Sequence, residues 1–549
     1  MIEFQPRLLR ALRTYNRQLF ARDVGAGLTV GVVALPLAMA FAIASGLKPE
    51  SGLFTAIVAG FLISLLGGSR VQIGGPAGAF IVIVYGIVER YGLGNLIIAT
   101  AMSGIMLFAM GVFKMGTLIR FIPVAVIIGF TNGIAVLIAV SQVKDFLGLQ
   151  VTNLPANFFG MTRALAGAMP TINLTATMVA GGSLALIVAW QFLLPKLLKN
   201  SPWAPTVAMM PGSVIALAAA TLAVSLLNLP VATIGSKFGG IPSSLPAFFW
   251  PEFSLDTVGL LLLPAATLAM LGAIESLLCA RVADSLISDR HDPNQELMAQ
   301  GIANFVTPFF GGMPATGTIA RTITNVKSGA TSPVAGMVHA VTLLVVMLVA
   351  APLAQNIPLA AMAAILLFVA WNMGEWREFL HLRNYRLPYR ATLLSVFFLT
   401  VLFDLTVAVE VGLVAACITF IYRISSLSRA ETMGVHEFPE LTGKEGQISV
   451  HRLYGAIFFG AVKLIEEIHD NLPGQTLVID LKNVIYIDSS GADTLNDLAR
   501  TCTKQGVHLI VCGLVHQPLD IARRSGFLEL LGQDNLFPDL ATGVAASVQ

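Results

Sequence analysis

Charged residues are scarce in this chain, at 12% of 549 residues, whereas an average soluble protein has about 25%. This shortage, with a hydrophobic fraction of 56%, argues against a large soluble enzyme. The net charge of +2 suggests no nucleic-acid partner. Only four cysteines are present and they are scattered, so we expect no disulfide framework, no metal site and no cofactor.

Motifs of enzymatic chemistry are also missing. The sequence has no HExxH and no phosphate-binding GxxxxGK[ST] loop, and its eight histidines are dispersed without a nucleophile–histidine–acid grouping. We therefore predict that the chain is not an enzyme.

Apolar stretches are abundant and follow one another from about Gly25 to Ile424. Many approach the roughly 20 residues that a helix needs to span a bilayer. The pattern predicts a multi-pass α-helical membrane protein with fourteen segments. They lie near 25–45, 51–66, 76–89, 95–113, 121–143, 172–194, 206–228, 257–280, 295–311, 315–327, 331–351, 357–373, 391–404 and 406–422.

The first segment is preceded by a cluster of arginines, which places the N-terminus in the cytoplasm by the positive-inside rule. An even number of segments returns the C-terminus to the same side. We therefore predict a plasma-membrane protein, in a bacterium the inner membrane, with both termini cytoplasmic. The arginines are Arg7, Arg10, Arg13, Arg17 and Arg22.

Two glycine-flanked breaks containing proline interrupt the apolar region, at 74–79 and 311–318. They occupy comparable places in a seven-plus-seven division, and the third and tenth segments begin at them. A helix that starts inside the bilayer leaves N–H groups unpaired and points its positive dipole end forward. Two such starts facing each other predict an anion pocket. The alternative is that these glycines only allow helices to pack closely.

Three side chains could serve this pocket. Arg321 lies about one turn into the tenth segment and could supply positive potential, or it could form a structural ion pair. Glu275 lies deep in the eighth segment, where a low dielectric favours a protonated carboxyl that could couple a proton to the anion. Alternatively, Glu275 could have a purely structural role and hold neighbouring helices together. Phe41, after Pro36, could form an apolar wall, or could face lipid.

Charges return in the last ~120 residues, where short strands alternate with polar helices. We predict three parts: a cytoplasmic segment 1–23, a transport domain 24–425 and a small α/β domain 430–549. Predicted strands cover 447–454, 475–481 and 507–513, and a predicted helix covers 460–469. Ser489 and Ser490 lie in a tight turn, where they could cap the next helix.

The chain resembles the SulP family of anion transporters, the bacterial relatives of prestin and pendrin. The resemblance rests on Ala34 to Gly46, Gly67 to Pro76, Gly272 to Leu277 and Gly301 to Phe305 leading into Gly311-Gly312. The C-terminal part resembles a STAS domain through its Asp-Ser-Ser-Gly turn and strand order. The family implies a seven-plus-seven inverted repeat with core and gate subdomains, an elevator mechanism and a homodimer.

The resemblance also implies where the anion binds. The implied site lies between the starts of segments three and ten, with Phe41 nearby and Arg321 behind. Its other residues are Ala77, Gly78, Thr316, Gly317 and Thr318. The serine matching Ser490 can be phosphorylated in soluble STAS proteins, which would add negative charge at a helix start.

Two features bear on the coupling ion and the substrate. Sodium-driven bicarbonate members have aspartate and threonine where this chain has Glu275 and Cys279. Because cysteine is a poor ligand for a hard cation, this favours H⁺ over Na⁺. The run Glu275 to Cys279 resembles a proton-coupled dicarboxylate transporter of the family. A departure at Leu37, where some relatives are polar, makes a ligand contact from that position doubtful.

We therefore predict secondary active transport of a small anion, either a C4-dicarboxylate such as fumarate or succinate, or sulfate or bicarbonate, by proton symport. Alternatives are sodium-coupled bicarbonate uptake, an uncoupled exchanger or channel, and a membrane-tethered regulatory module whose STAS domain binds a cytoplasmic partner. The predicted partners are the anion, the bilayer and a second copy of the chain.

Overall fold

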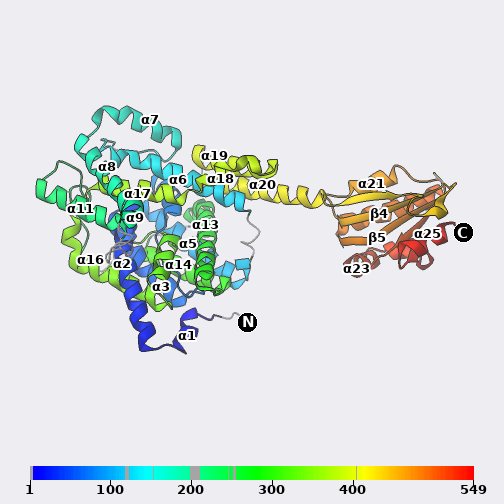
Figure 1. The fold of residues 1–549 in the computed structure, drawn as a ribbon, viewed down its shortest axis with the longest axis horizontal. Helices are drawn as coiled ribbons and strands as arrows, with labels where there is room; N and C mark the ends of the chain where they lie inside the picture. Colours follow the sequence, from blue (N-terminus) through cyan, green and yellow to red (C-terminus); the bar gives the residue numbers. More distant parts are fainter. Residues whose placement is uncertain are drawn as a thin grey trace. The chain divides into compact units, whose positions relative to one another are not determined.

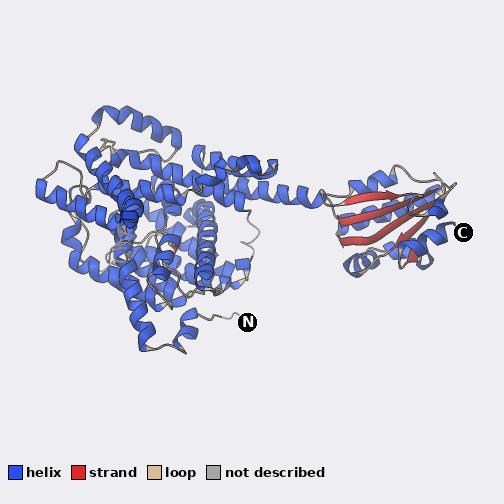
Figure 2. Cartoon of the chain, in the orientation of Figure 1, coloured by secondary structure: helices blue, strands red, loops and turns tan. Residues whose placement is uncertain are grey.

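The computed structural model describes residues 4–117, 123–151, 154–197, 211–244, 247–251, 255–403, 405–444 and 446–548. Contacts divide the chain into two compact units, Met1–Leu413 and Val414–Gln549. The first unit is helical, and the second contains a five-stranded sheet (Figures 1 and 2).

Each of the fourteen predicted segments contains a helix. The start of the seventh, at 206, lies outside the described residues. In chain order the helices are α2 (Arg17–Ala44), α3 (Pro49–Leu66), α4 (Ile81–Tyr91), α5 (Leu93–Val112), α6 (Val124–Phe146), α8 (Leu174–Val188), α11 (Gly212–Leu227), α13 (Leu255–Ile287), α14 (Pro293–Val306), α15 (Ile319–Lys327), α16 (Val334–Ala354), α17 (Leu359–Met373), α19 (Leu387–Leu402) and α20 (Leu405–Ser425).

Helix length separates these helices into classes. Within the described ranges, six stretches are long and apolar enough to cross a membrane, and four further apolar helices are shorter. Helices α4 and α15, which follow the two glycine-rich breaks, have only 11 and 9 residues. They are therefore too short to span a bilayer alone, as the breaks predict.

Short helices complete the first unit. They are α1 (Arg7–Leu12), α7 (Phe158–Ala168), α9 (Leu194–Leu197), α12 (Ile234–Phe238) and α18 (Trp376–Leu380).

Several helix boundaries differ from the prediction, and at two of them a polar side chain caps the helix. Helix α2 begins at Arg17 instead of 25, since the side chain of Asn16 accepts a hydrogen bond from the N–H of Leu19. Helix α14 begins at Pro293, where Asp292 accepts from the N–H groups of Asn294 and Gln295. Helix α13 continues to Ile287, seven residues beyond the predicted end at 280.

The spanning helices pack in two groups. One, which we call the core, comprises α2–α5 and α13–α16, and the other, the gate, comprises α6, α8, α11, α17 and α19. Glycines allow close approach inside the core: a Cβ added to Gly31 of α2 would lie 2.7 Å from Cγ2 of Thr342 in α16. The two groups match the core and gate subdomains that the resemblance implies.

The second unit is built on a mixed sheet of order β3-β4-β5-β6-β7, with β3 antiparallel to β4 and the other pairs parallel (Figure 2). Both faces of the sheet carry an apolar cluster. The predicted strands and helix of this unit are confirmed. The elements are β3 (Arg429–Met433), β4 (Ile448–Ile457), β5 (Thr476–Ile487), β6 (His508–Cys512), β7 (Leu536–Phe537), α21 (Lys463–His469), α22 (Ser489–Gln505), α23 (His516–Arg524), α24 (Phe527–Leu531) and α25 (Leu540–Val548).

The start of α22 is capped differently from the prediction. Asp488 is the N-cap residue, and its side chain accepts a hydrogen bond from the N–H of Gly491 at 2.8 Å. Ser489 and Ser490 are the first two residues of the helix, so they do not cap it. The carboxylate of Asp488, one residue earlier in the same turn, caps the helix instead. It accepts a hydrogen bond without having to orient a hydroxyl, and its negative charge interacts favourably with the positive end of the helix dipole.

Candidate functional site

The two glycine-rich breaks meet as a pair of very short strands. Strand β1 (Gly74–Gly75) pairs with β2 (Thr316–Gly317) in antiparallel register, with Gly74 opposite Gly317. The N–H of Thr318 extends the pairing by donating to the carbonyl of Ile73 at 2.8 Å. The backbones of the two halves are therefore in direct contact directly before α4 and α15 begin.

Both helices that follow the strands start without a side-chain cap in the described structure. A 3₁₀ turn, Gly78–Phe80, leads into α4, and Thr318 is the N-cap residue of α15. Such starts leave backbone N–H groups available and carry a partial positive charge. Because β1 and β2 pair, the two electropositive starts lie at one place in the core.

The predicted threonines are buried, and their hydroxyl groups are engaged. Thr316 Oγ1 donates to the carbonyl of Gly272 in α13 at 2.9 Å, and Thr318 Oγ1 donates to the carbonyl of Ile73 at 2.9 Å. Gly317 has no room for a side chain, since an added Cβ would overlap Nε2 of Gln72 and lie 2.8 Å from its Cδ and 3.1 Å from Cβ of Cys279. These side chains hold the break together.

Gly78 lies where the core meets the gate. A Cβ added to Gly78 would lie 3.6 Å from Cε1 of Phe41 in α2 and 3.5 Å from Sδ of Met373, the last residue of α17. Phe41 and Ala77 are buried. The structure thus brings Phe41, Ala77 and Gly78 together, as the resemblance implies. It adds Met373, which the sequence does not single out because a methionine at the end of an apolar segment is ordinary.

Arg321, the third residue of α15, is 1% exposed. A Cβ added to Gly75 of β1 would lie 2.5 Å from its Nη1, so the guanidinium contacts the strand pair. In the described residues neither Nη1 nor Nη2 has a hydrogen-bond partner. A buried cation with no acidic partner among these residues is costly, and it is complementary to a negatively charged ligand.

Glu275 lies in α13 and is half-buried. It is three residues after Gly272 and four before Cys279, so the three share one side of the helix, the side that packs against β2. Among the described ion pairs it has no partner, and it does not pair with Arg321. Cys279 is buried and its Sγ lies 3.2 Å from Oγ1 of Thr322.

A buried polar network that the sequence did not reveal supports the break from the other side. Glu296 of α14 is 1% exposed, and its Oε2 accepts from the N–H groups of Gly68 and Ser69 at 2.9 and 3.1 Å. Its Oε1 lies 3.4 Å from Oγ of Ser276, which in turn accepts from Nε2 of Gln72 at 3.2 Å. The network fixes residues 67–72, which lead directly into β1.

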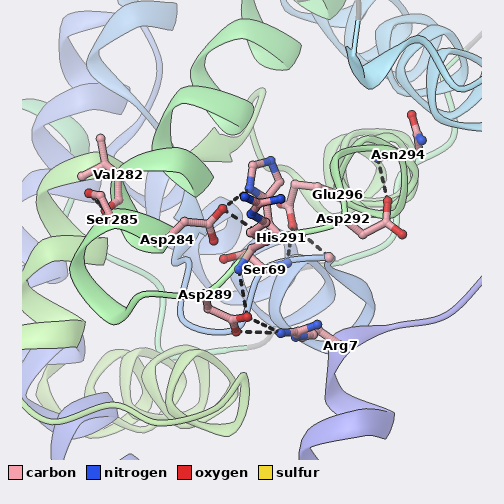
Figure 3. A network of polar contacts seen from close by, with 12 residues as sticks. Arg7, Ser69, Val282, Asp284, Ser285, Asp289, His291, Asp292, Asn294 and Glu296 are labelled. Carbon is pink, nitrogen blue, oxygen red and sulfur yellow. Dashed lines mark hydrogen bonds and ion pairs between the residues drawn. The ribbon is translucent and has the colours of Figure 1, made fainter. Parts of the chain in front are cut away.

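The connection between α13 and α14 extends this network to the start of the chain (Figure 3). Arg7 donates to both carboxylate oxygens of Asp289 at 2.6 Å, and its N–H donates to the carbonyl of Gly67 at 2.9 Å. His291 Nδ1 lies 2.7 Å from Oδ2 of Asp284. Although burial acts in the opposite direction, the hydrogen bond from Arg7 lowers the pKa of Asp289 below its usual value.

The core and gate also touch at the far end of α4. Tyr85 donates to the carbonyl of Leu154, and Glu89 accepts from the N–H of Ala156 at 3.1 Å. A cavity of about 40 Å³ lies between α4 and α6 beside these contacts, lined among others by Gln142 and Lys144. This end of the interface is therefore held by hydrogen bonds to the backbone of a loop.

Ser490 lies in the second unit, half-buried in the first turn of α22, where its carbonyl accepts from Thr494 Oγ1. Contacts place it in a different compact unit from the strand pair. A modification there remains a prediction from the resemblance.

Comparison with known proteins agrees with this architecture. Residues 20–388 match the Sulfate permease family and residues 439–543 match the STAS domain. The chain is 42% identical over 529 residues to the putative sulfate transporter YvdB of Bacillus subtilis, covering 95% of this chain and 97% of YvdB. It is 30% identical to the bicarbonate transporter BicA of Picosynechococcus, covering 90% and 89% of the two chains.

Solved structures share the fold. The structure of SLC26A9 superposes with a TM-score of 0.86 over 98% of this chain and 92% of that chain, at 18% identity. The transmembrane domain of a cyanobacterial BicA superposes with a TM-score of 0.63, at 30% identity, over 73% and 98%. A match of the family over residues 20–388, on a helical transporter fold with a STAS unit, identifies this chain as a member of the sulfate permease (SulP) family of anion transporters.

Proposed function

We propose that this transporter carries a small oxyanion or carboxylate, which binds at the paired starts of α4 and α15 in front of Arg321. The observation that carries the proposal is the contact of β1 with β2, because it brings two uncapped helix starts and a buried, unpaired guanidinium to one place. Backbone N–H groups and one cation favour an anion without selecting its shape.

Three substrates are candidates. Sulfate is supported by the 42% identity to a putative sulfate transporter, and bicarbonate by the 30% identity to BicA. A C4-dicarboxylate is supported by the run Glu275 to Cys279 alone. All three present carboxylate or oxyanion oxygens to the same backbone donors, so affinity must be measured to rank them.

Coupling to protons is the second part of the proposal, and Glu275 is its carrier. Its side chain lies on the surface of α13 that packs against β2, and no described cation neutralises it. A proton on this carboxyl would relieve its repulsion of an anion bound at the strand pair. Anion and proton would then enter together.

Movement of the core against the gate is the third part, with the N-terminus on the cytoplasmic side. Gly78 and Met373 face each other across the division, so a sliding core would carry the strand pair past α17. The outer contacts of Tyr85 and Glu89 would break in this motion. We also propose that the protein works as a homodimer, each copy with its own site.

The test is uptake into proteoliposomes of labelled sulfate, bicarbonate, fumarate and succinate, with an imposed pH gradient, a sodium gradient or neither. The expected result is accumulation of one class of anion only when the inside is alkaline. Sustained anion conductance in electrical recordings without a proton requirement would instead indicate a channel. If the full-length protein shows no flux of any of these anions, the membrane region would instead be interpreted as an anchor for the STAS unit.

Glu275→Gln isolates the coupling step. The variant should still bind the anion but lose accumulation driven by the pH gradient. The matched control is Glu440→Gln, an exposed glutamate of the second unit. Gradient-driven uptake by Glu275→Gln at the normal rate would remove Glu275 from the mechanism.

Sodium-coupled bicarbonate uptake is the second candidate, because of the similarity to BicA. Cys279 argues against it, since its thiol is hydrogen-bonded to Oγ1 of Thr322 and sodium prefers oxygen ligands. Uptake driven by sodium and indifferent to pH would establish this candidate in place of proton symport.

A further inference from the structure

A buried histidine lies beside the strand pair and has no part in the site described so far. His339 belongs to α16, whose sequence is otherwise almost entirely apolar, and its ring is 0% exposed. In the described chain neither ring nitrogen has a hydrogen-bond partner. Burying two polar atoms without partners costs stability, so a purely structural position would be expected to hold an apolar residue.

The ring packs against α3 at the level of β1. A Cβ added to Gly60 would lie 3.6 Å from Cε1 and 3.7 Å from Nδ1 of His339, and 3.1 Å from the carbonyl oxygen of Gly74. Gly60 thus leaves space that the imidazole ring and the strand both use. His339 is therefore separated from β1 by no more than one glycine of α3.

Arg321 approaches the same strand from α15. Its Nη1 would lie 2.5 Å from a Cβ added to Gly75, the neighbour of Gly74. The two side chains that lack partners therefore flank consecutive residues of β1. No acidic side chain forms an ion pair with Arg321 in the described ranges, so its charge is available to an anion.

The chemistry of the two groups is complementary. A guanidinium offers only donors, and a neutral imidazole offers one acceptor nitrogen. The two side chains make no direct hydrogen bond in the described structure, but a single bridging water would satisfy both. Further along the same helices, Ser64 and Asn325 each have a buried oxygen without a described partner, so polar groups continue beside this pair.

From this geometry we infer that His339 is a positioning residue for Arg321. Through one bridging water, the neutral ring is linked to the guanidinium and so holds its charge behind β1, directed at the helix starts. His339 itself does not touch the transported anion. The inference rests on the proposed function, because anion affinity is the property that His339 would control.

The test uses the full-length protein in detergent and measures the dissociation constant of the transported anion, with sulfate and bicarbonate as probes. His339→Leu introduces an apolar side chain of similar size that lacks the acceptor, and should weaken binding about tenfold. His339→Gln retains an acceptor and should recover at least part of the affinity. The control is Thr342→Val, one turn along α16, which should bind normally.

A double-mutant cycle separates positioning from packing. If His339 acts through Arg321, His339→Leu should weaken anion binding about tenfold in the parent protein. In the Arg321→Met background the same substitution should leave the anion affinity unchanged. The same factor in both backgrounds, or normal affinity of His339→Leu in the parent, would overturn the inference. A parent protein that binds neither probe would overturn the proposed site instead. Melting temperatures without anion report any packing cost separately.

Discussion

Gly78 of the core faces Met373 of the gate: a Cβ added to Gly78 would lie 3.5 Å from the methionine Sδ. The contact lies at the turn that leads into α4, beside Phe41. Any atom larger than hydrogen at position 78 would therefore enter the space between the helix start and the gate. We therefore expect a larger side chain at Gly78 to affect transport more than folding.

Gly78→Leu should fold and reach the membrane but transport less than a tenth of the parent rate, because its side chain would fill the space before α4. Gly86→Leu is the matched control, since nothing lies within 4 Å of a Cβ at Gly86 in α4, the helix that follows the turn. Initial rates of anion uptake in proteoliposomes check the prediction. Equal rates for both variants would show that the anion does not pass Gly78.

The carboxylate of Glu296 is predicted to be essential for the shape of the first break. In Glu296→Gln one acceptor oxygen becomes a donor, so either the N–H groups of Gly68 and Ser69 or Nε2 of Gln300 lose their acceptor. Leaving buried donors unpaired costs about 1–3 kcal/mol, which should lower the melting temperature and weaken anion binding together.

Exposed Glu467→Gln is the control for that substitution, because its carboxylate has only a surface ion pair with Lys463. Thermal unfolding in detergent followed by anion titration gives both quantities. An unchanged melting temperature with normal affinity would mean that Glu296 does not hold residues 67–72.

The ion pair between Arg7 and Asp289 should be lost at acid pH. The pKa of Asp289 is lower in the folded protein than its usual value near 3.8, so the link contributes stability above pH 3.8 and is lost as the pH falls through the folded value. A spin label at Leu9→Cys, in a Cys417→Ser background, should therefore be immobile at pH 5 and become mobile as the pH is lowered below 3.8 through the folded pKa of Asp289.

Arg7→Gln supplies the control for this prediction. The label in this variant should already be mobile at pH 5 and change little on acidification, because the side chain that ties α1 to Asp289 is gone while Arg70 remains paired with that carboxylate. Electron paramagnetic resonance spectra measure both states. A label equally immobile in the two proteins at pH 5 would show that Arg7 does not hold the N-terminal helix.

The sequence predicts the positions of the two breaks and of Arg321 because glycine, proline and a lone cation stand out in an apolar region. It does not predict that Gly74 pairs with Gly317, because backbone hydrogen bonds between distant segments have no side-chain pattern. The two breaks predict helix starts that face each other, and the structure adds the strand pairing directly before them.

Other parts of the site were missed for a different reason. Glu296 reads as an ordinary polar residue in the first turn of a helix, and only its burial against Gly68 distinguishes it. His339 and Met373 carry no neighbouring motif. Thr316 and Thr318 were predicted correctly as residues of the break, but their hydroxyl groups bond to backbone carbonyls, which depends on helices far away in the sequence.

The start of α22 provides a prediction for the STAS unit. Asp488→Ala removes the oxygen that accepts from the N–H of Gly491, and loss of an N-cap costs about 0.5–2 kcal/mol. Ser489→Ala and Ser490→Ala should each cost little, since neither hydroxyl caps the helix. Hydrogen exchange of residues 489–505 in the full-length protein measures the difference. Faster exchange in Ser490→Ala than in Asp488→Ala would show that Ser490, and not Asp488, caps the helix. A phosphate on Ser490 would then have to displace an existing hydrogen bond before it could act.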